Sequence, residues 1–456
     1  MKAELWKVGQ LRPGDFVRFI PIAYESAVQL YKNIQSSINS LELKHNPDVG
    51  VLRSMGACIL AYLPANSDRP SVVYRQAGDS YFLIEYGEME LNLAYRVRVH
   101  CLSECIHQKF VEGITELSPG VRSLQIQFDA TTLSRTDLIS LLVQIEDSLP
   151  SAASVEVPCR VVELPLAFED SATLEAVNRY RQTVRATAPW LPNNVDFIQR
   201  INGFDSRELV CSTIAAATYL VLGLGDVYLG APCAVPLDPR HRLVTSKYNP
   251  ARTYTAEGTV GIGGVYMCIY GMDSPGGYQL VGRTIPIWSR GRENPEPWLL
   301  KNFDKVSFYL VTEDELFRMR KMKDLSSVIR IRSSTFKLSE YAELLDQNAE
   351  SIDLFKSSQQ VAFNNEIKLW DSYGAAELSN DPFEHLLDFG DDHVPILAAS
   401  YGCVWKVLVK EGDVVTAGQD VVVLEAMKME SKEVSPCRGV VHAVVCAMGK
   451  VFVLWS

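Results

Sequence analysis

An internal duplication near the end of the chain constrains its fold more than any other feature. Residues 402–425 alternate apolar and polar positions around a Gly-Asp turn and an Ala-Gly-Gln turn, a pattern typical of paired β-strands. Five later residues repeat five positions of this segment in the same order. They are Gly439, Val441, Val444, Val445 and Gly449, which match Gly402, Val404, Val407, Leu408 and Gly412. The repeat predicts a small β-domain made of two similar halves.

The run Glu-Ala-Met-Lys-Met-Glu, residues 425–430, lies at the centre of this repeat. A lysine on a tight turn between two strands is exposed and is held by a rigid scaffold. Met427 and Met429 would offer soft, adaptable contacts to a modifying enzyme. An ordinary surface lysine in a hairpin is the alternative. The duplicated frame favours Lys428 as an attachment site.

The second half of the repeat is shorter than the first. It ends soon after Gly449, without a second Ala-Gly-Gln turn or a regular closing strand. The sheet then has an unpaired edge, unless residues 451–455 pair with it in another register. Whether the shortened domain accepts its modification is open at this point.

Composition and charge exclude several classes of protein. With 47% hydrophobic and 22% charged residues, the 456-residue chain is expected to form two to four globular domains. Its net charge of -11 argues against a nucleic-acid binder. The charge-free stretch 209–225 contains Ser, Thr and Gly, which favours buried core over a membrane helix. Because residues 1–7 lack the apolar segment of a secretory signal, we expect a cytoplasmic protein with no membrane partner.

The ten cysteines are scattered, which fits small buried residues better than a disulfide framework. His100, Cys101, Cys105 and His107 could supply metal ligands. They share an apparent amphipathic helix, however, and their spacing matches no closed zinc site. The sequence therefore predicts no metal site in this chain.

The first segment is expected to span residues 1–66. A Pro-Gly-Asp turn and the alternation of Phe16, Arg18 and Ile20 predict a strand, and a helix is expected over residues 23–43. A single strand cannot form a core. We therefore expect this segment to be the end of a domain whose earlier part is absent, and the chain to be a fragment.

Four further segments follow. Residues 67–158 predict a small α+β unit, with strands near Tyr74 and over 81–85 and 123–128, and helices over 91–112 and 135–148. Residues 159–325 carry short apolar strands between Gly and Pro turns, which predicts a β-barrel. Residues 326–392 are interpreted as a helical connector with periodicity from Ser334, and residues 393–456 contain the repeat. The fold class is mainly β with α+β parts.

Two sets of motifs resemble known families. The repeat around Lys428 resembles biotin carrier domains, which are biotinyl/lipoyl-type β-sandwiches. Residues 74–80, Tyr-Arg-Gln-Ala-Gly-Asp-Ser, resemble the first subunit of allophanate hydrolases, a family related to 5-oxoprolinase components. Segments 222–232, 249–254, 260–266, 274–279 and 282–284 look like the carboxyltransferase part of urea carboxylase of the urea amidolyase type. Residues 8–19 are similar to the end of the companion carboxyltransferase half.

The resemblance implies a cyclophilin-like barrel and biotin in amide linkage to Lys428. It also implies several partners: a biotin protein ligase, a companion carboxyltransferase half, and a biotin carboxylase domain outside this chain that uses ATP with Mg or Mn. The full-length protein is expected to be a homo-oligomer. The implied reaction transfers carboxyl from carboxybiotin to urea, giving allophanate. A guanidine or amidine acceptor and a noncatalytic fragment that only accepts biotin or binds partners are the alternatives.

Four residues of the barrel segment are candidate catalytic groups. Arg252 and Arg283 offer a planar fork for a carboxylate or ureido oxygen, although structural ion pairs are the alternative. Asp226 lies in an apolar frame that could shift its pKa, or it could cap a turn. Tyr278 could donate a hydrogen bond to a flat polar substrate.

The remaining candidates would bind substrate. The pairs Gly263-Gly264 and Gly276-Gly277 allow close backbone approach or serve as plain turns. Tyr266 and Gln279 could donate hydrogen bonds or belong to the core. Seven histidines are present, and none stands in a nucleophile-elbow context, so hydrolysis is not expected.

Overall fold

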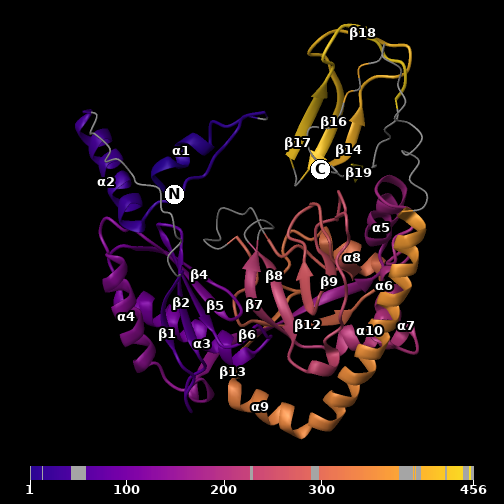
Figure 1. Cartoon of the computed structure of the whole chain (residues 1–456). Helices are drawn as coiled ribbons and strands as arrows, with labels where there is room; N and C mark the ends of the chain where they lie inside the picture. The colour runs from indigo at the N-terminus through magenta and orange to yellow at the C-terminus, as the bar shows by residue number, and fades with distance from the viewer. Residues whose placement is uncertain are drawn as a thin grey trace. The chain divides into compact units, whose positions relative to one another are not determined.

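The computed structural model describes residues 2–12, 14–42, 58–225, 230–288, 297–378, 394, 396, 402–426, 429–444 and 451–452. The chain divides into two compact units (Figure 1). One consists of Met1–Val157 with Phe336–Ala342, and the other of Pro158–Thr335 with Glu343–Ser456.

The first unit contains a five-stranded antiparallel sheet in the order β1-β2-β3-β5-β4. Its strands are β1 (Ile59–Leu63), β2 (Val72–Ala77), β3 (Tyr81–Tyr86), β4 (Ile114–Pro119) and β5 (Ser123–Phe128). Alternate residues of β3 and β5 are buried, and they pack with residues of α3 (Leu93–Lys109) and α4 (Arg135–Ser148) in one core. This period-2 burial is the signal that the sequence displays, and the predicted strands and helices of this region are confirmed.

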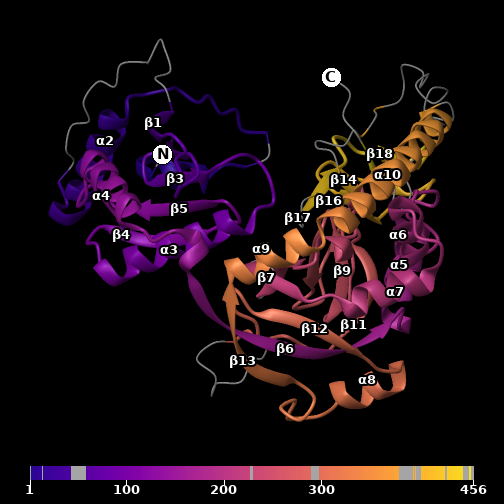
Figure 2. The ribbon, with the colours of Figure 1, turned by 90° about the horizontal axis from the view of Figure 1, so that it is seen from below.

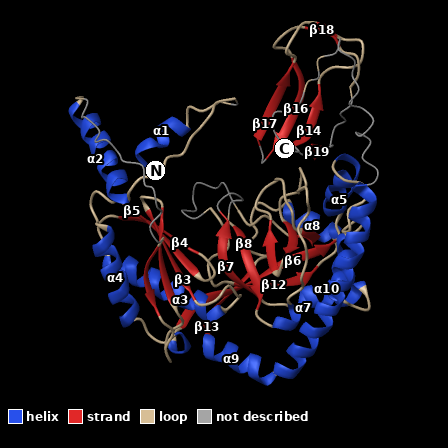
Figure 3. Ribbon diagram, in the orientation of Figure 1, coloured by secondary structure: helices blue, strands red, loops and turns tan. Residues whose placement is uncertain are grey.

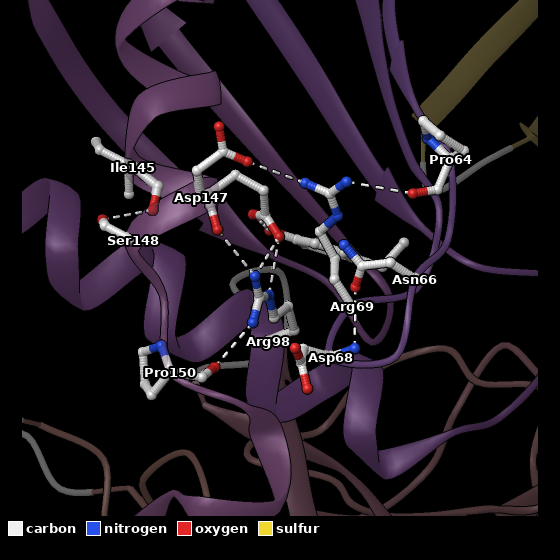
Figure 4. Close-up of polar contacts among 11 residues, drawn as sticks. Pro64, Asn66, Asp68, Arg69, Arg98, Ile145, Asp147, Ser148 and Pro150 are labelled. Atoms are coloured by element: carbon white, nitrogen blue, oxygen red, sulfur yellow. Dashed lines mark hydrogen bonds and ion pairs between the residues drawn. The ribbon is translucent and has the colours of Figure 1, made fainter.

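A buried ion pair joins α3 to α4 (Figure 4). The guanidinium of Arg98 lies 2.7 Å from Oε1 of Glu146, and its Nη1 donates to the carbonyl of Pro150 at 2.8 Å. The hydroxyl of Tyr86 donates to the other carboxylate oxygen at 2.6 Å. Both charged groups are removed from water. Loss of either one would therefore leave the other as a buried charge without its ion-pair partner, which is strongly destabilising.

The predicted strand around Phe16 is wrong. Residues 14–23 form no strand, and Phe16 and Phe19 are exposed. A strand needs a neighbour for its N–H and C=O groups, and within the described part of the chain nothing pairs with this segment. It follows the short helices η1 (Lys2–Glu4) and α1 (Leu5–Val8). The helix predicted after it is confirmed as α2 (Tyr24–Ser40).

The second unit contains an eight-stranded sheet in the order β11-β9-β10-β8-β7-β12-β6-β13. Figure 3 shows several of its strands in red, among them β7, β8 and β12. The strands are β6 (Glu156–Phe168), β7 (Tyr219–Gly225), β8 (Ala231–Pro236), β9 (Thr259–Gly263), β10 (Tyr266–Ile269), β11 (Gln279–Arg283), β12 (Lys305–Leu310) and β13 (Arg330–Lys337). β11 also pairs with β6, at Gly282 with Phe168, so the sheet closes on itself. A Cβ at Gly282 would lie 2.9 Å from the Cα of Phe168, so glycine allows this close approach.

Four helices accompany this sheet, and the sequence prediction of short strands alone missed them. They are α5 (Ser171–Thr183), α6 (Asn194–Asn202), α7 (Arg207–Ala216) and α8 (Glu313–Arg320). Val210 and Ile214 of α7 and Val221 of β7 belong to one core with the barrel strands, as predicted for the stretch 209–225, although Leu209 at its start is exposed. Among the described residues, no helix is long and apolar enough to cross a membrane.

The connector consists of α9 (Leu338–Gln347) and α10 (Ala349–Leu378). Its predicted helical start at Ser334 is wrong, because this residue belongs to β13. α10 runs alongside α6 (Figure 2), where Trp370 stacks on Phe197 with ring centroids 5.9 Å apart and Arg200 pairs with Glu366 at 3.2 Å. These contacts attach the connector to the second unit.

The C-terminal repeat folds into two small antiparallel sheets, β17-β16-β14-β19 and β15-β18. Its strands are β14 (Gly402–Val407), β15 (Val414–Val415), β16 (Asp420–Ala426), β17 (Met429–Val434), β18 (Gly439–Val440) and β19 (Val451–Phe452). β19 pairs with β14, with Gly402 opposite Phe452. Of the two outcomes left open by the sequence, the structure shows the pairing of residues 451–452 with the sheet edge.

Candidate functional site

The outer face of the barrel gathers several of the predicted residues. Met267 and Ile269 of β10 belong to the barrel core, so Tyr266 and Cys268 lie on the opposite face. Both are partly exposed. On this outer face, side chains of β10 therefore reach the protein surface.

Two glycines of β9 make room on this face for an aromatic ring. Gly263 and Gly261 pair with Tyr266 and Cys268, so all four positions share the outer face. A Cβ at Gly263 would lie 2.7 Å from Cγ of Tyr278, and one at Gly261 would lie 3.0 Å from its Cβ. The ring of Tyr278 therefore lies across the glycine positions. The absence of a side chain at Gly263 therefore leaves room for the ring of Tyr278.

Gly264 turns the chain from β9 into β10 with a φ of 62°. Its N–H donates to the carbonyl of Thr245 at 3.1 Å, and the N–H of Thr245 donates back at 3.0 Å. The N–H of Gly264 is thus already used within the protein. The turn alternative fits Gly264 better than ligand binding.

Tyr278 is half-buried, and its ring lies next to Lys247, a residue that was not among the predicted site residues. The Nζ of Lys247 lies 5.3 Å from the centroid of the Tyr278 ring, and Lys247 is exposed. Burial raises the pKa of Tyr278, and the neighbouring thiols of Cys268 and Cys233 raise it further. Burial also raises the pKa of Tyr266. Both phenols are therefore protonated hydrogen-bond donors at neutral pH.

Arg252 hydrogen-bonds to the backbone of Tyr278. Its guanidinium is buried and donates from Nη1 to the carbonyl of Tyr278 at 2.6 Å. Nη2 donates to the hydroxyls of Thr255 at 3.2 Å and Tyr270 at 3.3 Å, and the guanidinium stacks 4.2 Å from the ring of Tyr248. Since these contacts occupy its fork inside the protein, Arg252 fits the part of a positioning residue.

The second glycine pair closes the loop next to Arg252. The backbone of Gly276 exchanges two hydrogen bonds with that of Arg252, at 2.8 and 3.0 Å, and a Cβ at Gly276 would lie 2.6 Å from the ring of Tyr270. The carbonyl of Gly277 accepts from the N–H of Tyr248 at 2.7 Å. Both glycines shape the backbone that carries Tyr278.

The side chains of Gln279 and Arg283 are both engaged in contacts within the protein. Gln279 is fully buried, and its Nε2 donates to the carbonyl of Ser246 at 3.0 Å. Arg283 donates from Nε to the carbonyl of Glu257 at 2.8 Å and lies 3.9 Å from a carboxylate oxygen of Asp170. The core alternative fits Gln279, and the structural ion-pair alternative fits Arg283.

Three predicted residues, Asp226, Met427 and Lys428, lie outside the described residues. The two positions that flank the last pair are described: Ala426 ends β16, Met429 begins β17, and their backbones pair. The ladder continues through four further pairs as far as Val422 and Glu433. A regular hairpin of this kind fits the rigid, exposed support that a lysine-linked biotin requires.

The cluster considered for a metal lies on α3. The ring Nδ1 of His107 bonds to the carbonyl of Ser103 at 2.9 Å, and burial lowers the pKa of His100. Within the described ranges, no group of three His, Cys, Asp or Glu side chains could hold a metal ion.

Two family models match the chain. "Carboxyltransferase domain, subdomain C and D" matches residues 72–298, and "Biotin-requiring enzyme" matches residues 394–453. The chain therefore combines a carboxyltransferase domain with a domain whose cofactor is covalent biotin.

Several known proteins are similar to this chain over both the carboxyltransferase and the biotin segments. The chain is 44% identical over 441 residues to urea amidolyase of Saccharomyces cerevisiae, covering 94% of this chain and 24% of that protein. Urea amidolyase of Lachancea kluyveri is 44% identical over 443 residues, with the same coverage. The crystal structure of Kluyveromyces lactis urea carboxylase is 41% identical with a TM-score of 0.76, over 99% of this chain and 40% of that one. The chain is thus similar to urea amidolyases and urea carboxylases along nearly its whole length, and it spans about a quarter of the length of these curated relatives.

Proposed function

We propose that the chain is the carboxyltransferase half and biotin carrier of a urea carboxylase. In this reaction, carboxyl passes from carboxybiotin to a nitrogen of urea and gives allophanate. The observation that carries the proposal is the 44% identity to urea amidolyases along nearly the whole chain, through the carboxyltransferase and the carrier domains alike.

The outer face of the barrel, defined by Tyr266, Tyr278 and Lys247, is the proposed transfer site. The two phenols stay protonated because burial raises their pKa, so they can donate to the oxygen of urea or to a carboxylate. The exposed ammonium of Lys247 attracts an anionic carboxyl group to the same face. Arg252 fixes the backbone of Tyr278 and so its direction. Asp226 and Arg283 remain proposed catalytic residues whose contribution substitution would test.

Lys428 is the proposed attachment point of biotin, which supplies the carboxyl carrier when bound. The paired backbones of Ala426 and Met429 support the hairpin on both sides of this lysine.

The proposal also includes a cytoplasmic location and assembly into a homo-oligomer. Its proposed partners are a biotin protein ligase, a companion carboxyltransferase half, and an ATP-dependent biotin carboxylase domain with Mg or Mn. The barrel is proposed to be of the cyclophilin-like type, and the domain boundaries at 66, 158, 325 and 392 remain predictions.

ATP-dependent fixation of labelled bicarbonate by the full-length protein tests this function. We expect fixation with urea, and its loss in Lys428→Ala but not in Lys356→Ala, an exposed lysine of α10. Fixation that requires guanidine in place of urea would identify a guanidine carboxylase. Absence of fixation with either compound by a biotinylated protein would contradict a carboxylase function.

A further inference from the structure

Two thiols lie opposite each other on the outer face of the barrel. Met267 of β10 pairs with Ala234 of β8 in an antiparallel register. The next pair in this register is therefore Cys268 opposite Cys233. Because Met267 and Ala234 belong to the barrel core, the two cysteines share the other face, and both are partly exposed.

A hydrogen bond at the end of β8 shows where the backbone of Cys233 points. The N–H of Leu237 donates to the carbonyl of Thr218, which precedes β7, at 2.9 Å. Residues of one strand direct their N–H and C=O groups alternately to the two neighbouring strands. Cys233 lies four positions before Leu237, an even offset, so the polar groups of Cys233 also point to β7 and away from β10.

The same reasoning applies to Cys268 on β10. The N–H of Tyr270 donates to the carbonyl of Thr259 on β9 at 2.9 Å. Cys268, two residues earlier, therefore also directs its polar groups to β9 and away from β8. Cys233 and Cys268 thus form a non-hydrogen-bonded pair, in which the Cα atoms are about 4.5 Å apart and the side chains approach most closely. This separation lies within the range of about 4.4–6.8 Å that a disulfide spans.

The charges around the pair distinguish the two thiols. Burial raises the pKa of Cys268 to about 12. Burial also raises the pKa of Cys233, but the nearby ammonium of Lys247 opposes that shift. Of the two thiols, Cys233 therefore reaches the thiolate form more readily, and the thiolate is the nucleophile that attacks a peroxide.

We propose that Cys233 and Cys268 are a modification site that hydrogen peroxide converts into an intrachain disulfide. The thiolate of Cys233 attacks a peroxide oxygen, the O–O bond breaks, and a sulfenic acid and hydroxide form. The hydroxide takes up the proton that Cys233 released and becomes water. The sulfur of Cys268 then attacks the sulfenic sulfur, and the hydroxyl leaves with the proton of Cys268 as a second water. Two thiols and one peroxide give one disulfide and two waters.

This modification is independent of carboxyl transfer, although it would link β8 to β10 on the face that carries Tyr266. Peptide mapping of the whole chain tests it. The reduced protein is treated with hydrogen peroxide, its remaining thiols are alkylated, and it is digested with trypsin without reductant. Lysine and arginine positions place Cys268 in peptide 253–283 and Cys233 in peptide 208–240. The disulfide joins these two peptides, and a reductant separates them.

Cys211 shares the second peptide, so Cys211→Ser is the matched control. We expect the linked peptides in the wild type and in Cys211→Ser, and their loss in Cys233→Ser and Cys268→Ser. Linked peptides that persist without Cys233, or disappear in Cys211→Ser, would overturn the assignment. So would the absence of any link in the wild type at a peroxide dose that oxidises Cys58, an exposed thiol of the same chain. This last comparison uses no variant and therefore does not depend on the folding of one.

Discussion

Replacement of Gly263 by alanine tests the packing of the proposed transfer site. The added Cβ would lie 2.7 Å from Cγ of Tyr278, well inside van der Waals contact. Cγ is the first ring atom, so rotation of the ring cannot relieve the overlap, and the whole side chain has to move. We therefore expect Gly263→Ala to destabilise the barrel and to displace Tyr278.

The expected magnitude follows from two opposing effects. Overpacking a buried position costs about 1–3 kcal/mol. Replacing a strand glycine by alanine gains about 0.5–1 kcal/mol from reduced chain entropy. Gly223→Ala on β7 is the matched control, because no atom lies within 4 Å of its added Cβ and its φ is not positive. The two variants should differ by about 2 kcal/mol, or about 4–8 °C in the melting temperature of the second unit.

Calorimetry of the wild type, the two alanine variants and a Tyr278→Leu background provides the measurement. In that background the ring is gone, so Gly263→Ala should lose most of its penalty. Equal melting temperatures for Gly263→Ala and Gly223→Ala, or an undiminished penalty without the ring, would refute the packing of Tyr278 on Gly263.

Three further predictions concern the buried ion pair, the phenols and the cation. Glu146→Ala should destabilise the first unit by about 3–5 kcal/mol, since it leaves the buried Arg98 charge unpaired. Asp147→Ala, which removes an exposed carboxylate, should cost less than about 1 kcal/mol in denaturant titrations. The folded-state pKa of Tyr278 is raised, so its contribution to stability is complete below the ordinary tyrosine pKa of about 10 and declines above it. Tyr278→Phe should therefore flatten the alkaline decline of the melting temperature, and an unchanged slope would count against the buried phenol. Lys247→Ala should lower kcat/KM of the full-length enzyme about tenfold, equivalent to about 1.4 kcal/mol, with Lys247→Arg close to wild type; equal losses in both would argue against a role for the charge.

The predictable part of the fold follows from regular patterns in the sequence. Strands β2, β3 and β5 and helices α3 and α4 were predicted because each has a buried face, which shows as period 2 or 3.6. β4 was missed because none of its residues is fully buried. α7 was missed because the charge-free stretch 209–225 runs from this helix into β7 without a break in composition. A signal was present: the side chain of Ser206 caps α7 by accepting from the N–H of Leu209.

The strand predicted around Phe16 shows the opposite error. Alternation of side chains is a local property, whereas a strand requires a partner that the local sequence cannot supply. Within the described residues, the same kind of pattern at 451–452 has a partner in β14 and does form a strand.

The candidate site was predictable in its residue types but not in their directions. Tyr266 and Tyr278 share a face, but Gln279 is fully buried and bonds to the loop at Ser246. Motif matching cannot separate neighbours such as Tyr278 and Gln279, because their faces depend on the register of β11. Lys247 carries no motif of its own, and only the folded loop brings it next to the Tyr278 ring.

The intact mass of this chain after coexpression with a biotin protein ligase tests the central claim most directly. The account predicts a gain of one biotin in the wild type and in Lys432→Ala, where the lost lysine pairs with Asp420 on the neighbouring strand. It predicts no gain in Lys428→Ala. That result would show that the domain closed by β19 folds as a functional carrier. An unmodified wild type, or biotin retained in Lys428→Ala, would contradict the assignment of Lys428 as the carrier lysine.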